Sequence, residues 1–307
     1  MEPFSNSGKT VLVTGATGQQ GGAVAARMLE KGWKLRALTR NVQSHAAKAL
    51  AQQGVEIMQG DLENPASIEA AVRGVYGVFS VQDHAAGAER EIQQGKNLAD
   101  AALKAGVTHF VYNSVGGADR KTGIDIWERK FVVEQYIKKL GLPATIFRPS
   151  TFLDDFYFDI LELGILKGVY RSPVRGDKEY QMIAVYDIGG FVALAFERPK
   201  EFIGMELEIA GSTLTNNQAA EVFTKVLKRP VKFSRLPMPI TRLMVGKEVY
   251  RMFQWLNESG YKADVAGLRQ RYPELRLKSL EDWLYMEGWE KHARPVGFRN
   301  GAWGWKH

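Results

Sequence analysis

Residues 10–22 of the chain read TVLVTGATGQQGG. The first five are apolar or β-branched, which is typical of a buried strand, and glycines follow at positions 15, 18 and 21. In such a turn the first glycine permits the tight bend, the second lets backbone N–H groups approach a phosphate, and the third lets a helix pack closely on the strand. A helix is expected next, over residues 22–31. The stretch therefore predicts a βα unit that holds a dinucleotide pyrophosphate at the positive end of its helix.

The alternation of strand and helix continues through the first half of the chain. Strands are expected at residues 10–14, 34–38, 55–58, 77–81, 109–114 and 144–147. Helices are expected between them, at residues 22–31, 44–53, 65–72, 88–105 and 125–140. This order predicts an α/β fold with a Rossmann-type, doubly wound parallel sheet. We therefore assign residues 1–150 to a predicted NAD(P)-binding Rossmann domain.

The pattern loosens after residue 150. Helices are expected at residues 189–196, 215–227, 240–259 and 280–286, and strands at residues 206–210 and 231–236. Residues 151–307 are predicted to form a smaller, mixed α+β C-terminal lobe for a substrate or partner, from which a segment at about 181–210 returns to the first domain.

Composition limits the possible chemistry. The 307 residues include no cysteine, which excludes disulfides, thiolate metal sites and cysteine nucleophiles. The five histidines are not at metal-binding spacing, so no metal is expected. No apolar run approaches the roughly 20 residues of a membrane helix. We therefore expect a cytoplasmic protein without a membrane span.

The net charge of +7 is unevenly distributed. Residues 225–307 carry 17 basic and 8 acidic side chains, so an acidic partner would belong to the C-terminal lobe. A basic cluster there raises the alternative of nucleic-acid binding, but no recognised motif accompanies it, and a solvated basic face is the preferred interpretation. The cluster consists of Lys225, Lys228, Arg229, Lys232 and Arg235.

The ends of the next strands indicate which dinucleotide binds. NAD sites usually place an acid about 20 residues after the loop, at the end of the second strand. This chain has Arg40 and Asn41 there, and a guanidinium suits the 2′-phosphate of NADP(H). Asp61, followed by Leu62, ends the third strand and can meet the adenine amino group. Near the nicotinamide half, the fourth strand ends in Ser80, Val81 and Gln82.

The glycine loop and the segments at residues 39–41, 59–62, 112–114, 148–152 and 187–189 together resemble the NmrA-like family of atypical short-chain dehydrogenases/reductases. The resemblance covers about residues 8–235. It implies a Rossmann-type fold and NADP(H) as cofactor. The family includes regulators and NADPH sensors, and it includes or borders on quinone, dye and isoflavone-type reductases. The resemblance places these residues at the cofactor: Gly15, Thr17, Gly18, Gln19, Gln20, Gly21, Arg40, Asn41, Asp61, Leu62, Ser80, Val81, Gln82, Lys130 and Phe152.

The sequence departs from its wider superfamily at the catalytic centre. Typical members carry a serine and a tyrosine four residues before a lysine, and the tyrosine gives a proton as hydride reaches a carbonyl. Ser114 and Lys130 match the serine and the lysine, and they are the candidate catalytic residues. The tyrosine position holds Ile126, which has no proton to give. The helix start at Glu89, Arg90 and Glu91 is interpreted as ordinary and exposed.

Two functions remain open at this point. The first is an NADPH-dependent reductase of an apolar small molecule, such as a quinone, a dye or a conjugated alkene, which can accept hydride without a strong protein acid. The second is a non-catalytic NADP(H) redox sensor that regulates a protein partner or transcription. A homodimer is left open in both cases.

Overall fold

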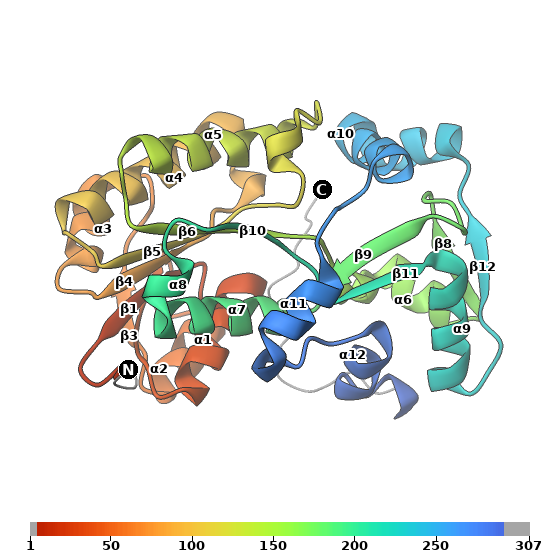
Figure 1. Cartoon of the computed structure of the whole chain (residues 1–307), viewed down its shortest axis with the longest axis horizontal. Helices are drawn as coiled ribbons and strands as arrows, with labels where there is room; N and C mark the ends of the chain where they lie inside the picture. The colour runs from red at the N-terminus through yellow and green to blue at the C-terminus, as the bar shows by residue number, and fades with distance from the viewer. Residues whose placement is uncertain (1–4, 292–307) are drawn as a thin grey trace.

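The computed structural model describes residues 5–291. Among them, one parallel sheet consists of β1 (Thr10–Thr14), β2 (Lys34–Thr39), β3 (Glu56–Gln59), β4 (Gly77–Ser80), β5 (His109–Asn113), β6 (Ala144–Pro149) and β10 (Glu206–Ile209). The spatial order is β10-β6-β5-β4-β1-β2-β3 (Figure 1). The order reverses between β1 and β4, which is where doubly wound sheets bind ligands.

Helices cover both faces of this sheet (Figure 1). One face carries α1 (Gln19–Glu30), α2 (His45–Gln52) and α7 (Val185–Glu197), and the other carries α3 (Pro65–Val72), α4 (Ala88–Lys104) and α5 (Asp125–Lys139). The predicted Rossmann-type α/β fold is therefore confirmed. Gly189 shows how tightly α7 lies on α1, because a Cβ there would be 2.6 Å from the carbonyl oxygen of Ala23.

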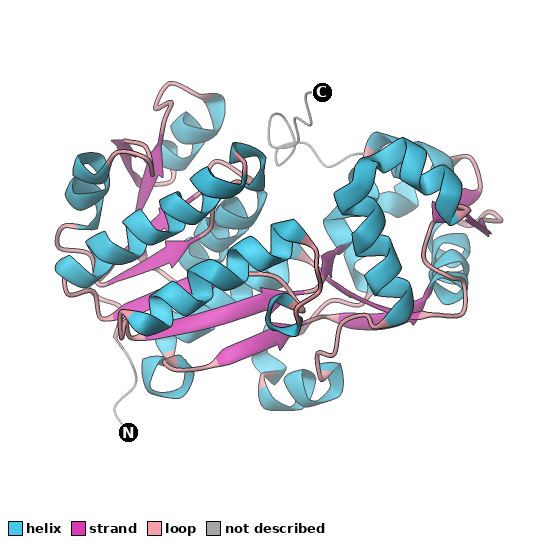
Figure 2. Ribbon diagram, turned by 90° about the horizontal axis from the view of Figure 1, so that it is seen from above, coloured by secondary structure: helices cyan, strands magenta, loops and turns pink. Residues whose placement is uncertain are grey.

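The smaller lobe lies beside the carboxyl edge of the sheet (Figure 2). Its strands are β7 (Thr151–Phe152), β8 (Val169–Ser172), β9 (Glu179–Ile183), β11 (Ser212–Thr215) and β12 (Lys232–Arg235), arranged as β11-β9-β7 and β12-β8. Its helices include α6 (Asp159–Leu166), α9 (Asn216–Leu227), α10 (Met238–Glu258) and α12 (Leu280–Met286). The short helices α8 (Pro199–Phe202) and α11 (Val265–Arg271) lie nearer the large sheet (Figure 1). The core of the smaller lobe contains an aromatic cluster, in which Phe156 packs against Phe223 and Trp283.

The sequence predicts that a segment at about residues 181–210 returns to the first domain. Helix α7 packs on α1, and β10 pairs with β6 at the edge of the large sheet. We propose on this basis that residues 181–210 belong largely to the dinucleotide-binding lobe, although they follow residue 150 in the chain.

Several features of the fold differ from the sequence prediction, among them the following. Helix α1 begins at Gln19 rather than at residue 22, so the end of the glycine loop is already its first turn. The helix expected at residues 240–259 is interrupted at Gly246, whose φ of 73° is not helical. Strands β8, β9 and β11 were not predicted, because they are short and carry many polar residues. No helix within residues 5–291 is long and apolar enough to cross a membrane.

Candidate functional site

A cleft of about 950 Å³ lies over the carboxyl ends of the strands around the point where the strand order reverses. Its walls come from the glycine loop, the ends of β2 and β3, and the segment after β4. Eight residues that the sequence assigned to the cofactor line it: Gly15, Thr17, Gly18, Arg40, Asn41, Asp61, Leu62 and Val81. The residues that line the cleft follow the first three strands of the chain, as binding of the adenosine half of a dinucleotide would require.

The glycine loop has the conformation that its sequence predicts. Gly15 has a φ of +61°, in the left-handed region that glycine tolerates, and its carbonyl oxygen accepts a 2.8 Å hydrogen bond from the Gly18 N–H. A Cβ at Gly21 would lie 2.3 Å from the Gly15 oxygen, so only glycine allows α1 this close to β1. The N-cap residue of α1, Gly18, offers no side-chain cap. The first N–H groups of α1 are therefore available for an anion at the cleft wall.

Thr14 fixes the loop to the neighbouring strand. Its hydroxyl accepts a 3.0 Å hydrogen bond from the Val81 N–H and lies 3.1 Å from the Val81 carbonyl oxygen, to which it can donate. The ends of β1 and β4 are thereby locked together at the reversal point. This rigidity holds the anion-binding N–H groups in place.

One end of the cleft carries positive charge. Arg40 is exposed at the end of β2 and forms no hydrogen bond or ion pair within residues 5–291. Arg90 also lines the cleft, where it pairs with Glu63 at 2.6 Å. The hydrogen bonds from Arg90 and Gln94 hold the pKa of Glu63 below its usual value. Glu63, Arg90 and Gln94 were missed from sequence, because nothing in their spacing shows that α4 begins beside the end of β3.

The other half of the predicted site lies at the ends of β4, β5 and β6. Buried polar atoms here lack any hydrogen-bond partner among the described residues: Gln82 Oε1, Asn113 Oδ1, Ser114 Oγ and Ser150 Oγ. Buried polar groups normally form hydrogen bonds. Polar atoms without a hydrogen bond at the ends of these strands therefore suit contact with a polar ligand. A carboxamide and ribose hydroxyls would supply the missing partners. The residues present therefore fit the nicotinamide half of a dinucleotide.

Two further predicted residues connect the halves of the site. Gln20, at the start of α1, accepts a hydrogen bond from the Asn113 amide at the end of β5. Oε1 of Gln19 is buried and has no hydrogen-bond partner among the described residues. Ser80 lies fully buried and accepts a 2.9 Å hydrogen bond from Gln82, so its contact with a ligand would be indirect.

Lys130, on α5, forms a buried ion pair with Glu91 of α4. Its ammonium lies 3.0 Å from Glu91 Oε1, and the two side chains are only 12% and 1% exposed. The interpretation of the α4 start as ordinary and exposed was thus wrong for Glu91, because packing of α4 on α5 buries it. An ammonium has three N–H groups, so Lys130 can keep this pair and still donate to a ribose.

Two further positions that the sequence analysis singled out are Phe152 and Ile126. Phe152, in β7, is half-buried against the core that also contains Val81. Ile126 packs in a separate aromatic cluster with Trp127, Trp255 and Tyr261. Neither lines the large cleft.

Comparison with known proteins shows the family of this chain. The model of the NmrA-like family matches residues 7–285. The chain belongs to the NmrA-like family. An NmrA-like family domain-containing protein of Dictyostelium discoideum is 28% identical over 296 residues, which cover 90% of this chain and 97% of that protein.

Proteins that resemble this chain in sequence or in fold include one named for nitrogen metabolite repression and one named as a reductase. The nitrogen metabolite repression protein nmrA of Emericella nidulans is 26% identical, over 75% of this chain and 68% of its own length. The triphenylmethane reductase of Citrobacter sp., solved with NADP(H), superposes with a TM-score of 0.77 at 21% identity, covering 91% of this chain and 99% of that one. The structural likeness shows the shared fold.

Proposed function

We propose that the cleft binds NADP(H) and that the protein is an NADPH-dependent reductase of an apolar, electron-poor small molecule. The observation that carries the proposal is the glycine loop, because Gly21 can hold no other side chain and the uncapped start of α1 faces the cleft. NADPH, when bound, supplies a hydride. Gly15 and Gly18 would hold the pyrophosphate, while Asp61 would meet the adenine and Lys130 the ribose.

Arg40 carries the choice of NADP(H) over NAD(H). Arg40→Ala is expected to weaken NADPH binding by about 10- to 100-fold, since a hydrogen bond to a charged group contributes roughly 1.5–3 kcal/mol. NADH lacks the 2′-phosphate and should bind as before. Titration of nicotinamide fluorescence with each dinucleotide measures both constants. Arg73→Ala, at an exposed arginine outside the cleft, is the matched control. An equal loss for NADPH and NADH would contradict the assignment.

The absence of a tyrosine at position 126 favours substrates that accept hydride readily. Ile126 lies in an apolar and aromatic cluster and has no group that could protonate a carbonyl. Quinones, cationic dyes and conjugated alkenes take hydride because they are electron-poor. The named dye reductase with a similar fold supports this class of substrate.

A redox sensor is the second candidate. The relative in nitrogen metabolite repression favours it, and so does the exposed apolar surface of α10, where Leu243 is 89% exposed. A sensor would change shape or assembly on binding NADPH without oxidising it. Limited proteolysis and sedimentation with and without NADPH, run beside an NADPH oxidation assay, separate the two functions. Oxidation with an electron-poor acceptor supports the reductase, whereas an NADPH-dependent change without oxidation supports the sensor.

A further inference from the structure

The proposed reductase lacks a proton donor where its superfamily has one, yet a hydroxyl from another part of the chain reaches the same neighbourhood. Tyr261 follows α10 and packs in one cluster with Ile126 and Trp127. Its ring centroid lies 5.9 Å from that of Trp127 and 5.5 Å from that of Trp255. The position that lost its tyrosine is therefore close to a tyrosine that is 135 residues further along the chain.

Tyr261 also lies over the part of the sheet that would meet the nicotinamide. A Cβ at Gly116, three residues after β5, would be 2.6 Å from the Tyr261 ring, so the ring rests on this backbone. The Tyr261 hydroxyl is 3.1 Å from Oγ1 of Thr151, which follows β6 and precedes Phe152. These contacts place Tyr261 beside the segments that follow β5 and β6. The same segments carry Ser114 and Ser150, whose buried hydroxyls have no hydrogen-bond partner among the described residues.

The Tyr261 hydroxyl is the last group in a chain of hydrogen bonds that runs from Tyr180 through Thr151. Tyr180, on β9, donates a 2.8 Å hydrogen bond to Thr151 Oγ1. Thr151 can then donate its own proton to the Tyr261 oxygen, which leaves the Tyr261 O–H free to donate to a third group. Asp155 is close enough for its charge to raise the pKa of both Tyr180 and Tyr261. Burial and the adjacent Asp154 raise the pKa of Asp155 to about 8, so much of it keeps its proton at neutral pH.

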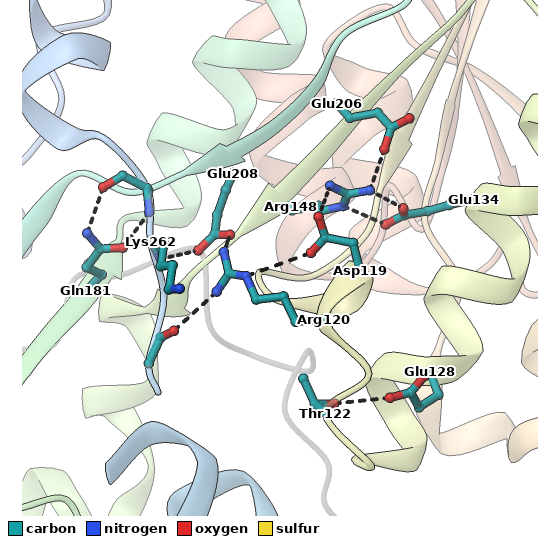
Figure 3. A network of polar contacts seen from close by, with 12 residues as sticks. Asp119, Arg120, Thr122, Glu128, Glu134, Arg148, Gln181, Glu206, Glu208 and Lys262 are labelled. Carbon is teal, nitrogen blue, oxygen red and sulfur yellow. Dashed lines mark hydrogen bonds and ion pairs between the residues drawn. The ribbon is translucent and has the colours of Figure 1, made fainter. Parts of the chain in front are cut away.

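The backbone on both sides of Tyr261 is held by side chains of the large sheet and its surroundings (Figure 3). Arg120 donates a 3.2 Å hydrogen bond to the Gly260 carbonyl, and the Lys262 N–H donates a 2.6 Å one to Glu208. Gln181 exchanges hydrogen bonds of 2.9 and 2.8 Å with the N–H and carbonyl of Ala263. Such fixation from three directions is what a precisely placed functional group needs.

We propose that Tyr261 is the proton donor of the reductase and replaces the tyrosine that position 126 lacks. This inference rests on the proposed reductase function. Reduction of a quinone consumes one hydride, supplied by NADPH, and one proton, and it yields NADP⁺ and the quinol. The proton passes from Tyr261 Oη to the phenolate oxygen of the reduced quinone. Thr151 then returns a proton to Tyr261 as it takes one from Tyr180, and Tyr180 regains its proton from water before the next turnover. Burial raises the pKa of Tyr261, so the hydroxyl stays protonated until a strong base arrives.

Two acceptors distinguish a proton donor from a merely structural tyrosine. A quinone needs a hydride and a proton, whereas a cationic triarylmethane dye becomes neutral on taking up hydride alone. Tyr261→Phe is expected to lower kcat with an apolar quinone by about 100-fold, in the range of general acid catalysis, and to leave kcat with the dye within about twofold. Thr151→Val, which keeps the Tyr261 ring but breaks the relay, should show the same selectivity to a smaller degree.

Binding and stability readouts make the test independent of turnover. The NADPH dissociation constant of Tyr261→Phe, from nicotinamide fluorescence, and its thermal midpoint should match those of the wild type. Tyr285→Phe, at an exposed tyrosine of α12, is the matched control and should change neither rate. Equal loss with both acceptors, or no loss with the quinone, would overturn the role of Tyr261 while leaving the reductase intact. A wild type that oxidises NADPH with neither acceptor would overturn the proposed function, and this inference with it.

Discussion

Gly21→Ala is expected to weaken NADPH binding by about 100-fold. The added Cβ would lie 2.3 Å from the carbonyl oxygen and 2.4 Å from the carbonyl carbon of Gly15. Both atoms are backbone, so α1 must move away from β1, and its first N–H groups leave the cleft wall. Loss of two hydrogen bonds to a phosphate at about 1.5 kcal/mol each weakens binding roughly 100-fold. Titration of nicotinamide fluorescence measures this constant.

The same variant should also be less stable. Overpacking of a tight contact costs about 3 kcal/mol, which lowers the thermal midpoint by roughly 5 °C in a chain of this size. Gly18→Ala is the matched control for folding, because its Cβ would lie 3.3 Å from the same oxygen, a contact that a small shift relieves. Its thermal midpoint should stay near that of the wild type. A Gly21→Ala protein with wild-type affinity for NADPH would show that the loop does not hold the pyrophosphate.

Arg148→Met is expected to cause the largest loss of stability. Arg148 is buried at the end of β6 and donates to Glu134 at 3.1 and 2.6 Å, to Glu206 at 2.6 Å and to Asp119 at 2.9 Å (Figure 3). Glu134 is fully buried, so removal of Arg148 leaves its carboxylate without its charged partner. Breaking a buried pair in this way costs about 3–5 kcal/mol. Chemical denaturation measures the free energy of unfolding.

The matching double variant separates lost pairing from lost packing. Arg148→Met combined with Glu134→Gln removes both charges and should recover part of the stability, because no unpaired carboxylate remains. Asp119 precedes Arg120, which holds the backbone beside Tyr261, so the single variant should also slow the reduction of quinones. A single variant no less stable than the double variant would mean that the network contributes little beyond packing.

The dinucleotide half of the site follows closely from local sequence. The glycines, Arg40 and Asp61 stand at fixed offsets from buried strands. Gly15, Gly18, Arg40 and Asp61 line one cleft at the ends of β1, β2 and β3, and Gly21 packs α1 on β1. The strands can be predicted from their apolar, β-branched composition, because a strand that is buried on both faces carries few polar residues. The N-cap Asn64 and the capping box at Ser279 were likewise predictable from short-range chemistry.

The substrate half could not be predicted in the same way. Tyr261 lies in a segment without regular structure, and its partners Thr151 and Tyr180 are 110 and 81 residues away in the chain. Strand β9, which carries Tyr180 and Gln181, mixes polar and apolar residues over only five positions. Glu91 shows the same limit, since its burial depends on α5 and not on its neighbours in sequence. A pattern of residues reports local periodicity, whereas these sites depend on contacts between distant segments.

The most direct test of the account is the oxidation of NADPH by the purified wild-type protein. The protein is mixed with NADPH and, in separate reactions, with an apolar quinone and a cationic triarylmethane dye, and the absorbance band of the reduced nicotinamide is followed. We predict catalysed loss of this band with both acceptors, and a much slower loss with Gly21→Ala at NADPH concentrations that do not saturate this variant. NADPH binding without oxidation above the protein-free rate with either acceptor would contradict the account.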